Sequence, residues 1–151
     1  MLLKRIFRKE FFITLFIKQN KWHRYSVLGH TVRVAYYAFK DKQYKMIPAA
    51  FLHDIGKPVI AFQDEEDKLS NEYSFTNHEE ISYQLIKNIP FISDYTKQLV
   101  RYHFLIRGKE IAKRKGKQGR CNRLNRIFNN LNNDMQKDLE IFIVFDDKAK
   151  S

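Results

Sequence analysis

The sequence has little cysteine and no long hydrophobic run. Its 151 residues include a single cysteine, Cys121, which excludes an internal disulfide framework and a thiolate zinc cluster. No apolar stretch approaches the roughly 20 residues of a membrane-spanning helix. The apolar patch Phe11–Ile17 is short, lacks a small-residue cleavage site and is followed by polar and basic residues, so we expect no signal peptide. We therefore expect a cytoplasmic protein without a membrane-embedded part.

The sequence also lacks internal repeats, low-complexity tracts and interdomain linkers. Its length suits one domain with a sizeable core, and its 13 Phe and 8 Tyr supply core material. Apolar residues recur at helical spacing over 3–18 and 26–40, and strand-like patterns are almost absent. We expect residues 1–151 to form one all-α domain, a bundle of about six or seven helices. Residues 1–22 would form an N-terminal amphipathic helix that packs on the core.

Turn and cap signals place the other expected helices. Pro48 suits the first turn of a helix that Gly56 and Pro58 end. Thr76-Asn77-His78-Glu79 has the pattern of a capping box, with a hydroxyl at the cap and a carboxylate three residues later. Residues 59–75 are polar and acidic, and we expect a connecting loop there. Two further helices are expected, over 93–105 and from about 133 to the end of the chain.

The pair His53-Asp54 is the most informative feature of the chain. It ends an apolar helical segment, just before Gly56. A buried His–Asp pair is costly to desolvate unless a charge lies between its atoms. A divalent cation fits, because imidazole and carboxylate suit Mg, Mn and the harder transition metals. His30, on an apolar helical segment, and the pair Asp146-Asp147, after the apolar run 141–145, can supply the missing ligands.

This order of residues, H…HD…D, resembles the ligand pattern of the HD-domain metal-dependent phosphohydrolases. The stretch HDIGKP looks especially like the HD domains attached to bacterial tRNA nucleotidyltransferases and their small stand-alone relatives. The resemblance covers roughly residues 23 to 150. It implies an HD-domain helical bundle around a metal site held by His30, His53, Asp54 and one terminal aspartate. Asp146 continues the apolar face of the last helix, whereas Asp147 better matches the family's Asp-Lys-x-x-small ending, and both stay candidates.

Two further histidines, His78 and His103, lie where many HD enzymes place additional ones. The resemblance implies that they complete a second metal site, or contact the substrate phosphate and the leaving group. The alternative interpretation is a histidine in a helix cap for His78 and a half-exposed helical histidine for His103. For His23, a loop or surface role is expected.

Three basic residues are candidates for binding phosphate. Lys57 lies in the turn just after the His-Asp pair, where an ammonium group can neutralise phosphate oxygens as charge develops. Arg101 and Arg107 flank His103 and could act in the same way. Their alternative role is that of solvated arginines on the face of a helix.

The formal net charge of +11 is unevenly distributed. Between residues 107 and 126, nine Lys or Arg residues face a single acid, Glu110. Glycines at 108, 116 and 119 predict an exposed, mobile loop, which we describe as a basic insertion over 107–120. Such a positive segment attracts polyanions, so RNA contact through 107–126 is one interpretation and a solubilising loop is the other.

Together these features predict a metal-dependent phosphohydrolase. It would cleave a phosphomonoester or phosphodiester of a nucleotide or nucleic acid with metal-activated water, using one or two Mn, Mg, Fe, Ni or Co ions. Asp54, Lys57, His78 and His103 are the expected catalytic residues. A non-catalytic HD-fold module that binds nucleotide or RNA, and a di-iron oxygenase on an HD scaffold, are the alternatives. The sequence does not specify the oligomeric state.

Overall fold

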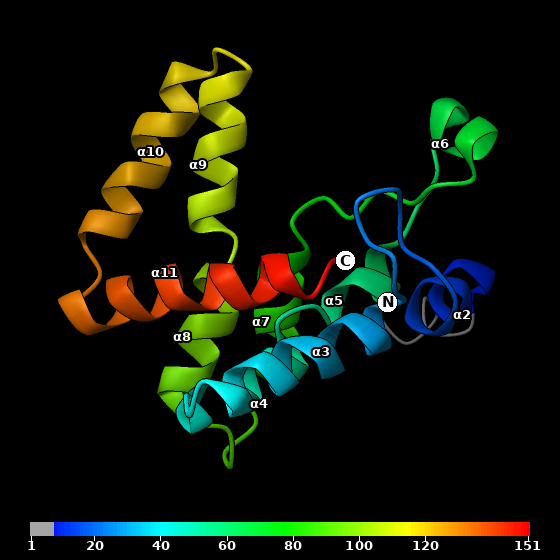
Figure 1. The fold of residues 1–151 in the computed structure, drawn as a ribbon. Helices are drawn as coiled ribbons and strands as arrows, with labels where there is room; N and C mark the ends of the chain where they lie inside the picture. Colours follow the sequence, from blue (N-terminus) through cyan, green and yellow to red (C-terminus); the bar gives the residue numbers. More distant parts are fainter. Residues whose placement is uncertain (1–7) are drawn as a thin grey trace.

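The structure, a computed structural model, describes residues 8–151, and these residues fold into helices (Figure 1). Within that range the only β-type pairing is an isolated bridge between Phe62 and Ser74. The all-α prediction is therefore confirmed. Seven of the described α-helices have eight or more residues: α2 (Lys9–Phe16), α3 (Val27–Lys40), α7 (His78–Ile86), α8 (Asp94–Tyr102), α9 (Leu105–Arg114), α10 (Gln118–Asn129) and α11 (Asn133–Lys148). Three are shorter: α4 (Ile47–Leu52), α5 (Gly56–Ile60) and α6 (Glu65–Ser70).

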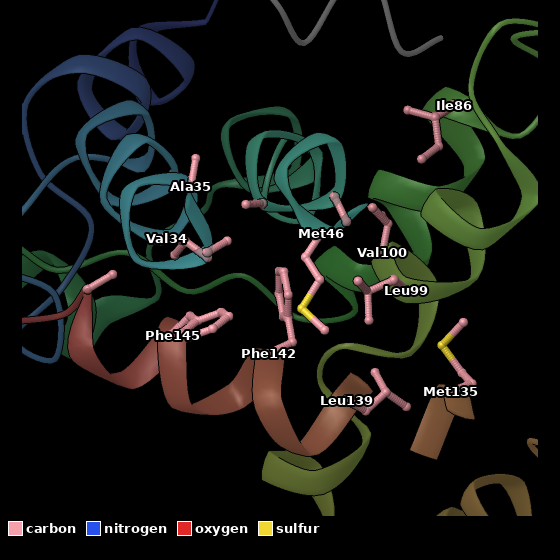
Figure 2. Packing of buried hydrophobic residues seen from close by; sticks show 14 residues of the cluster. Val34, Ala35, Met46, Ile86, Leu99, Val100, Met135, Leu139, Phe142 and Phe145 are labelled. Carbon is pink, nitrogen blue, oxygen red and sulfur yellow. The ribbon is translucent and has the colours of Figure 1, made fainter. Parts of the chain in front are cut away.

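The hydrophobic core lies where α3, α4, α8 and α11 meet. Helix α11 contributes Met135, Leu139 and Phe142, which recur every three or four residues and therefore share one face. Figure 2 shows Phe142 beside Met46, and Phe145 turned toward Val34. Burying a side chain of this size stabilises the fold by about 1.5–3 kcal/mol. Beyond Phe142, the same face of α11 continues into the polar part of the molecule.

Two helices begin where the sequence predicts, and each start is capped by a side chain. Helix α8 begins after Ser93, whose side chain accepts a hydrogen bond from the Thr96 amide. Helix α11 begins after Asn132, whose side chain accepts one from the Met135 amide. Such caps satisfy amide groups that have no partner within the helix.

Gly56 has a different role from the one predicted. It does not lead the chain out of helical structure but opens the short helix α5. A Cβ atom at this position would lie 2.6 Å from the carbonyl oxygen of His78 and 2.7 Å from the amide nitrogen of Ser82. Glycine is required because the backbones of α5 and α7 approach each other this closely.

Two further predictions about the middle of the chain are wrong. Residues 59–75 are not a plain loop, because they contain α6, whose N-terminus is closed by a capping box from Asp64. The capping box predicted at Thr76–Glu79 does not form. The residue that caps α7 is Asn77, which is left-handed with φ 59° and makes no side-chain cap hydrogen bond.

The expected basic loop is helical, which is the largest difference between prediction and structure. Residues 107–120 belong to α9 and α10, joined by a tight turn at Gly116, which has φ 64°. There the Lys117 amide donates to the Ala112 carbonyl and the Gly116 amide to the Lys113 carbonyl, the hydrogen bonds of a Schellman motif. Gly108 lies inside α9, where a Cβ would be 3.3 Å from Leu124 of α10. Glycine here serves close helix packing, not flexibility.

The N-terminal helix is shorter than predicted within the described residues. Helix α2 covers Lys9–Phe16 of the expected helix over 1–22, and residues 1–7 lie outside the described part. After α2, residues 17–26 lead to α3 without regular structure. Among the described residues, no helix has the length and apolar character needed to cross a membrane.

Candidate metal centre

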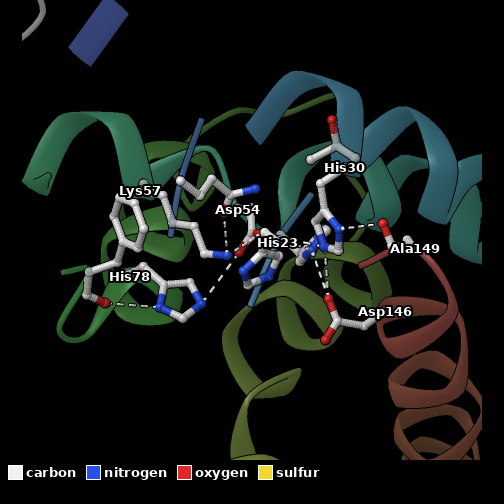
Figure 3. Close-up of polar contacts among 12 residues, drawn as sticks. His23, His30, Asp54, Lys57, His78, Asp146 and Ala149 are labelled. Carbon is white, nitrogen blue, oxygen red and sulfur yellow. Dashed lines mark hydrogen bonds and ion pairs between the residues drawn. The ribbon is translucent and has the colours of Figure 1, made fainter. Parts of the chain in front are cut away.

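Side chains from five parts of the chain meet at one buried point beside the core. His30 comes from α3, His53 follows α4, and Asp54 lies between α4 and α5. The other three come from the start of α7, the end of α8 and the end of α11, and are His78, His103 and Asp146. Figure 3 shows Asp54 in the middle of this cluster, with His78 on one side and His30 and Asp146 on the other. We call these six residues the His/Asp cluster.

One half of the cluster consists of His30, His53 and Asp146. The Nε2 atom of His30 lies 2.9 Å from Asp146 Oδ1, and Nε2 of His53 lies 3.7 Å from the same oxygen. The donor atoms of these three residues all lie within 4.8 Å of one another, close enough to share an ion. Both histidines are fully buried, and the ring of Phe142 packs 5.4 Å from that of His53.

Asp54 connects this half of the cluster to the other. Its Oδ2 atom lies 3.3 Å from His53 Nε2 and 3.7 Å from His30 Nε2. Its Oδ1 atom points the other way, 3.3 Å from His78 Nε2 and 3.8 Å from His103 Nε2. The two oxygens of one carboxylate therefore face two separate groups of imidazole nitrogens.

All four histidines of the cluster use their second ring nitrogen in the same way. The Nδ1 atoms of His53, His78 and His103 lie 2.8, 3.1 and 2.7 Å from the carbonyl oxygens of Ala50, Phe75 and Val100. In each case the carbonyl belongs to the residue three positions earlier. The Nδ1 atom of His30 lies 3.4 Å from the carbonyl of Ala149. Since a carbonyl only accepts, Nδ1–H donates, and in the neutral ring this leaves a lone pair on Nε2.

These lone pairs need a positive charge between them. The Nε2 atoms of His78 and His103 are 3.3 Å apart, and both also face Asp54 Oδ1. Nε2 of His53 and both oxygens of Asp54 are buried and have no well-aligned hydrogen-bond partner. Lys57 Nζ lies beside Oδ2 of Asp54, whereas Oδ1 faces the Nε2 atoms of His78 and His103. Electron-rich atoms this close together are unfavourable in a dry environment. The donor set of imidazole and carboxylate fits a divalent metal ion.

Burial and neighbouring charges set the protonation of the cluster. Burial lowers the pKa of His78 to about 4 and, together with nearby His53, that of His103 to about 3. Burial would also lower the pKa of His53, but the charge of Asp54 outweighs it and raises the value to about 9. Burial acts to raise the pKa of Asp54, whereas His53 and Lys57 hold it well below its usual range.

Comparison with known families agrees with this geometry. The family model described as HD domain matches residues 27–146. The chain belongs to the HD-domain family. The predicted family and its helical fold are thereby confirmed, whereas the match does not show the resemblance to the HD domains of tRNA nucleotidyltransferases. No significant match to this chain is found among the curated proteins or among the solved structures.

Membership of the family has general chemical consequences. HD domains bind divalent metals, are generally hydrolases, and point to the metal-dependent phosphohydrolase superfamily with nucleotide-type substrates. The cluster of buried histidine and aspartate side chains in this HD domain is compatible with metal binding.

The structure places the two terminal aspartates in different surroundings. Asp146 contacts the cluster, and its second oxygen, Oδ2, lies 3.1 Å from Lys150 Nζ. Asp147 forms ion pairs with Arg107 and Lys150, and 49% of its side chain is exposed. Of the two candidates, Asp146 is therefore the one that faces the histidines of the HD domain.

Lys57 reaches the cluster from α5. Its Nζ atom lies 2.7 Å from Asp54 Oδ2 and donates a hydrogen bond of 3.0 Å to the Gln19 side-chain oxygen. Gln19 is fully buried and in turn donates to the carbonyl of Tyr25. The buried amide thus holds the ammonium group beside the His/Asp cluster.

The two candidate arginines lie apart from each other. Arg107 lies at the mouth of the site, where it forms ion pairs with Glu110 and Asp147. Arg101 points elsewhere: its guanidinium lies over the ring of Tyr83 at 4.5 Å and forms an ion pair of 3.1 Å with Glu80. The structure therefore places Arg107, but not Arg101, close to the site.

His23 is the residue whose surroundings differ most from the expected surface role. Its ring packs edge-on against His30, 5.0 Å away, and its Nδ1 lies 3.0 Å from the side-chain oxygen of Asn20. Burial and nearby Lys57 lower its pKa to about 2. The segment that carries it has no helical periodicity, so no sequence pattern could place it beside the cluster. The one local feature of the sequence that could have indicated the position of His23 is the Asn20 side chain, three residues earlier.

A cavity of about 900 Å³ opens from the cluster to solvent. Asp54, Lys57 and His78 lie at its inner end. Its outer walls come from the segment 20–23, from residues 74–79 and from α9, α10 and α11. This volume is in the range of sites for small ligands and cofactors. Several cations line the outer walls: Arg107, Arg114, Lys115, Arg120 and Lys150.

Proposed function

We propose that this HD domain is a metal-dependent phosphohydrolase that cleaves a phosphomonoester or phosphodiester of a nucleotide or nucleic acid. One observation carries the proposal. Imidazole Nε2 atoms and carboxylate oxygens crowd together around Asp54, at the inner end of a cavity lined with cations. Such a site suits a divalent metal on one side and a phosphate group on the other.

Two metal positions that share Asp54 are supported by the geometry. His30, His53, Asp146 and Oδ2 of Asp54 would hold one ion. His78, His103 and Oδ1 of Asp54 would hold a second. A bound divalent ion supplies Lewis-acid polarisation of the phosphoryl group and lowers the pKa of a coordinated water molecule. Mn, Mg, Fe, Ni and Co all accept these donors, so the donor set does not choose among them.

The residues of the chain then have separate roles in the reaction. The Lys57 ammonium group neutralises negative charge that develops on the phosphoryl oxygens. Asp54 orients the attacking water by accepting a hydrogen bond from it. Where the second ion is absent, Nε2 of His78 or His103, unprotonated because burial lowers the pKa of both rings, would accept the proton that the attacking water releases and then donate it to the leaving oxygen. Arg107, already at the mouth of the cavity, binds the substrate phosphate.

The test is hydrolysis by the purified protein after chelation, with Mn, Mg, Ni, Co or Fe added back. Substrates would be a generic phosphodiester and a panel of nucleotides. We expect turnover that requires metal and is lost in the His53→Ala, Asp54→Ala double variant. Arg101→Gln, a change outside the cluster, is the matched control. Metal content of each protein, measured by elemental analysis, reports whether one or two ions bind per chain.

Other results would replace this function with another. Turnover that requires oxygen and iron would favour a di-iron oxygenase on the same scaffold. Full metal loading with an intact fold and no turnover on any substrate would favour a module that binds nucleotide or RNA. A cytoplasmic location, expected from the sequence, is part of the same proposal.

A further inference from the structure

Helices α9 and α10 form an arm that begins at the His/Asp cluster. Helix α9 starts at Leu105, two residues after His103, and α10 packs beside it after the turn at Gly116. Figure 1 shows the pair projecting away from the helices that form the core. We call residues 105–129 the arm. Because its base adjoins the cluster, a molecule that follows the cavity-lining side of the arm inward reaches the cluster.

The positive charge of the arm is mostly not neutralised by the protein. Nine cations lie between residues 107 and 126 against one acid, Glu110. Among the described residues, the only one of these nine that forms an ion pair is Arg107. Arg114, Lys115 and Arg120 are exposed, and all three line the cavity that contains Asp54. Unpaired cations at the mouth of an anion-binding site attract further anions.

These cations extend further than one phosphate group. Arg107, Ile111 and Arg114 are spaced by four and three residues and therefore share one face of α9. Seven residues of helix separate Arg107 from Arg114, a rise of about 10 Å. Lys57 and the metal ligands already serve the phosphate that reacts. Cations about 10 Å further out along the helix fit additional phosphates of a longer substrate.

The shape of the cavity favours unpaired bases. Asp54, His78 and His103 are buried at its inner end, so a phosphoester must enter the cavity to reach them. A base pair at that position would have to open first, at a cost of a few kcal/mol. Trp22 lines the cavity and is 70% exposed, so its ring is available for a base to stack on.

We propose that the substrate of this HD domain is the end of a single-stranded polynucleotide. Its backbone follows Arg114, Lys115 and Arg120 along the arm, a base stacks on Trp22, and its terminal phosphoester reaches the cluster. This inference rests on the proposed phosphohydrolase function and narrows its substrate class. A free mononucleotide would leave the cations of the arm without a partner.

The experiment compares oligonucleotides of one, two, four and eight nucleotides with a terminal phosphoester, as RNA and as DNA, in the metal-loaded protein. We expect kcat/KM to rise with length and then level off once the arm is covered. The test variant is Arg114→Gln, Lys115→Gln, Arg120→Gln. It should lose the dependence on length. In a plot of log affinity against log salt, its slope should be smaller than that of the wild type by about 2, at ~0.7 per lost phosphate contact.

The matched control removes the same charge from the same arm. Lys113→Gln, Lys117→Gln, Arg123→Gln changes three cations that do not line the cavity, and it should keep the dependence on length. Equal loss in both triple variants, or a rate independent of length in the wild type, would overturn the inference. Equally tight binding of duplex and single strand would also overturn it.

A binding measurement separates this inference from the proposed function. Fluorescence anisotropy with a fluorescein-labelled single-stranded octamer reports affinity without any turnover. Binding that the test variant weakens and the control does not, with no hydrolysis under any metal, would reject the phosphohydrolase and keep the ligand class. Hydrolysis of mononucleotides with no binding of the octamer would keep the phosphohydrolase and reject the polynucleotide.

Discussion

The His/Asp cluster and the arm carry charge in opposite ways. In the cluster, ionisable side chains are buried and each imidazole is fixed by a carbonyl oxygen. On the arm, Arg114, Lys115 and Arg120 are exposed and form no ion pair among the described residues. Buried charges interact strongly and depend little on salt, whereas exposed charges are screened. Fixed side chains therefore lie where the proposed chemistry would occur, and adaptable side chains lie where the proposed polynucleotide would bind.

The largest loss of activity is expected at one of two neighbouring aspartates. Asp146→Asn removes a carboxylate that faces His30 and His53, and we expect kcat/KM to fall by about 10²–10³-fold, as when one charge-stabilising group of an active site is lost. Asp147→Asn changes an exposed carboxylate and should cost less than about tenfold. Steady-state kinetics with saturating metal measures both. Equal losses would mean that the Asp147 carboxylate contributes to the reaction as much as that of Asp146.

A loss of stability of intermediate size is expected where α5 packs against α7, beside the cluster. Gly56→Ala places a Cβ against the backbone of α7, and we expect a loss of about 1–3 kcal/mol in the free energy of unfolding. Gly119→Ala on the arm is the control, because a Cβ there would have no atom within 4 Å and alanine favours helix. Thermal or urea unfolding followed by circular dichroism gives both values. A stable Gly56→Ala protein would show that α5 and α7 can separate freely.

The smallest effect concerns an arginine that belongs to neither region. Arg101 is half-exposed, stacks on Tyr83 and pairs with Glu80. We expect Arg101→Gln to change kcat/KM by less than about twofold and the free energy of unfolding by less than about 1 kcal/mol. The same assays used above measure both. A large loss of activity would show that a cation outside the cavity also contributes to binding substrate.

The sequence was sufficient to predict the residues at the centre of the site, but not those at its periphery. His30, His53 and Asp54 follow a pattern whose chemistry requires them to meet, and the helices that carry them have clear apolar periodicity. Asp146 and Asp147 could not be separated, because adjacent helical residues point about 100° apart and only the packing of α11 decides which one faces inward. His23 could not be placed because it lies in irregular chain, whose path depends on contacts such as Gln19 with Lys57.

The arm was mispredicted for a physical reason. Three glycines among many like charges are typical of a loop, yet each glycine here has its own role. Gly108 lets α10 approach α9, Gly116 forms the turn, and Gly119 lies in the first turn of α10. Helix packing through Gly108 and Leu124 overrides the local signals. The long helices α3, α8 and α11, which have strong caps and apolar faces, were predicted well.

The hydrogen bonds that orient His53, His78 and His103 have a consequence for mutational studies. Each ring is oriented by a main-chain oxygen, that of Ala50, Phe75 or Val100. No substitution of those three side chains deletes the oxygen, so a screen of side-chain substitutions would miss these contacts to the histidines. Only a change that redirects the chain itself, such as a proline in the turn before a ligand, would reveal it. The orientation of these histidines therefore depends on the path of the backbone and not on the identity of a neighbouring side chain.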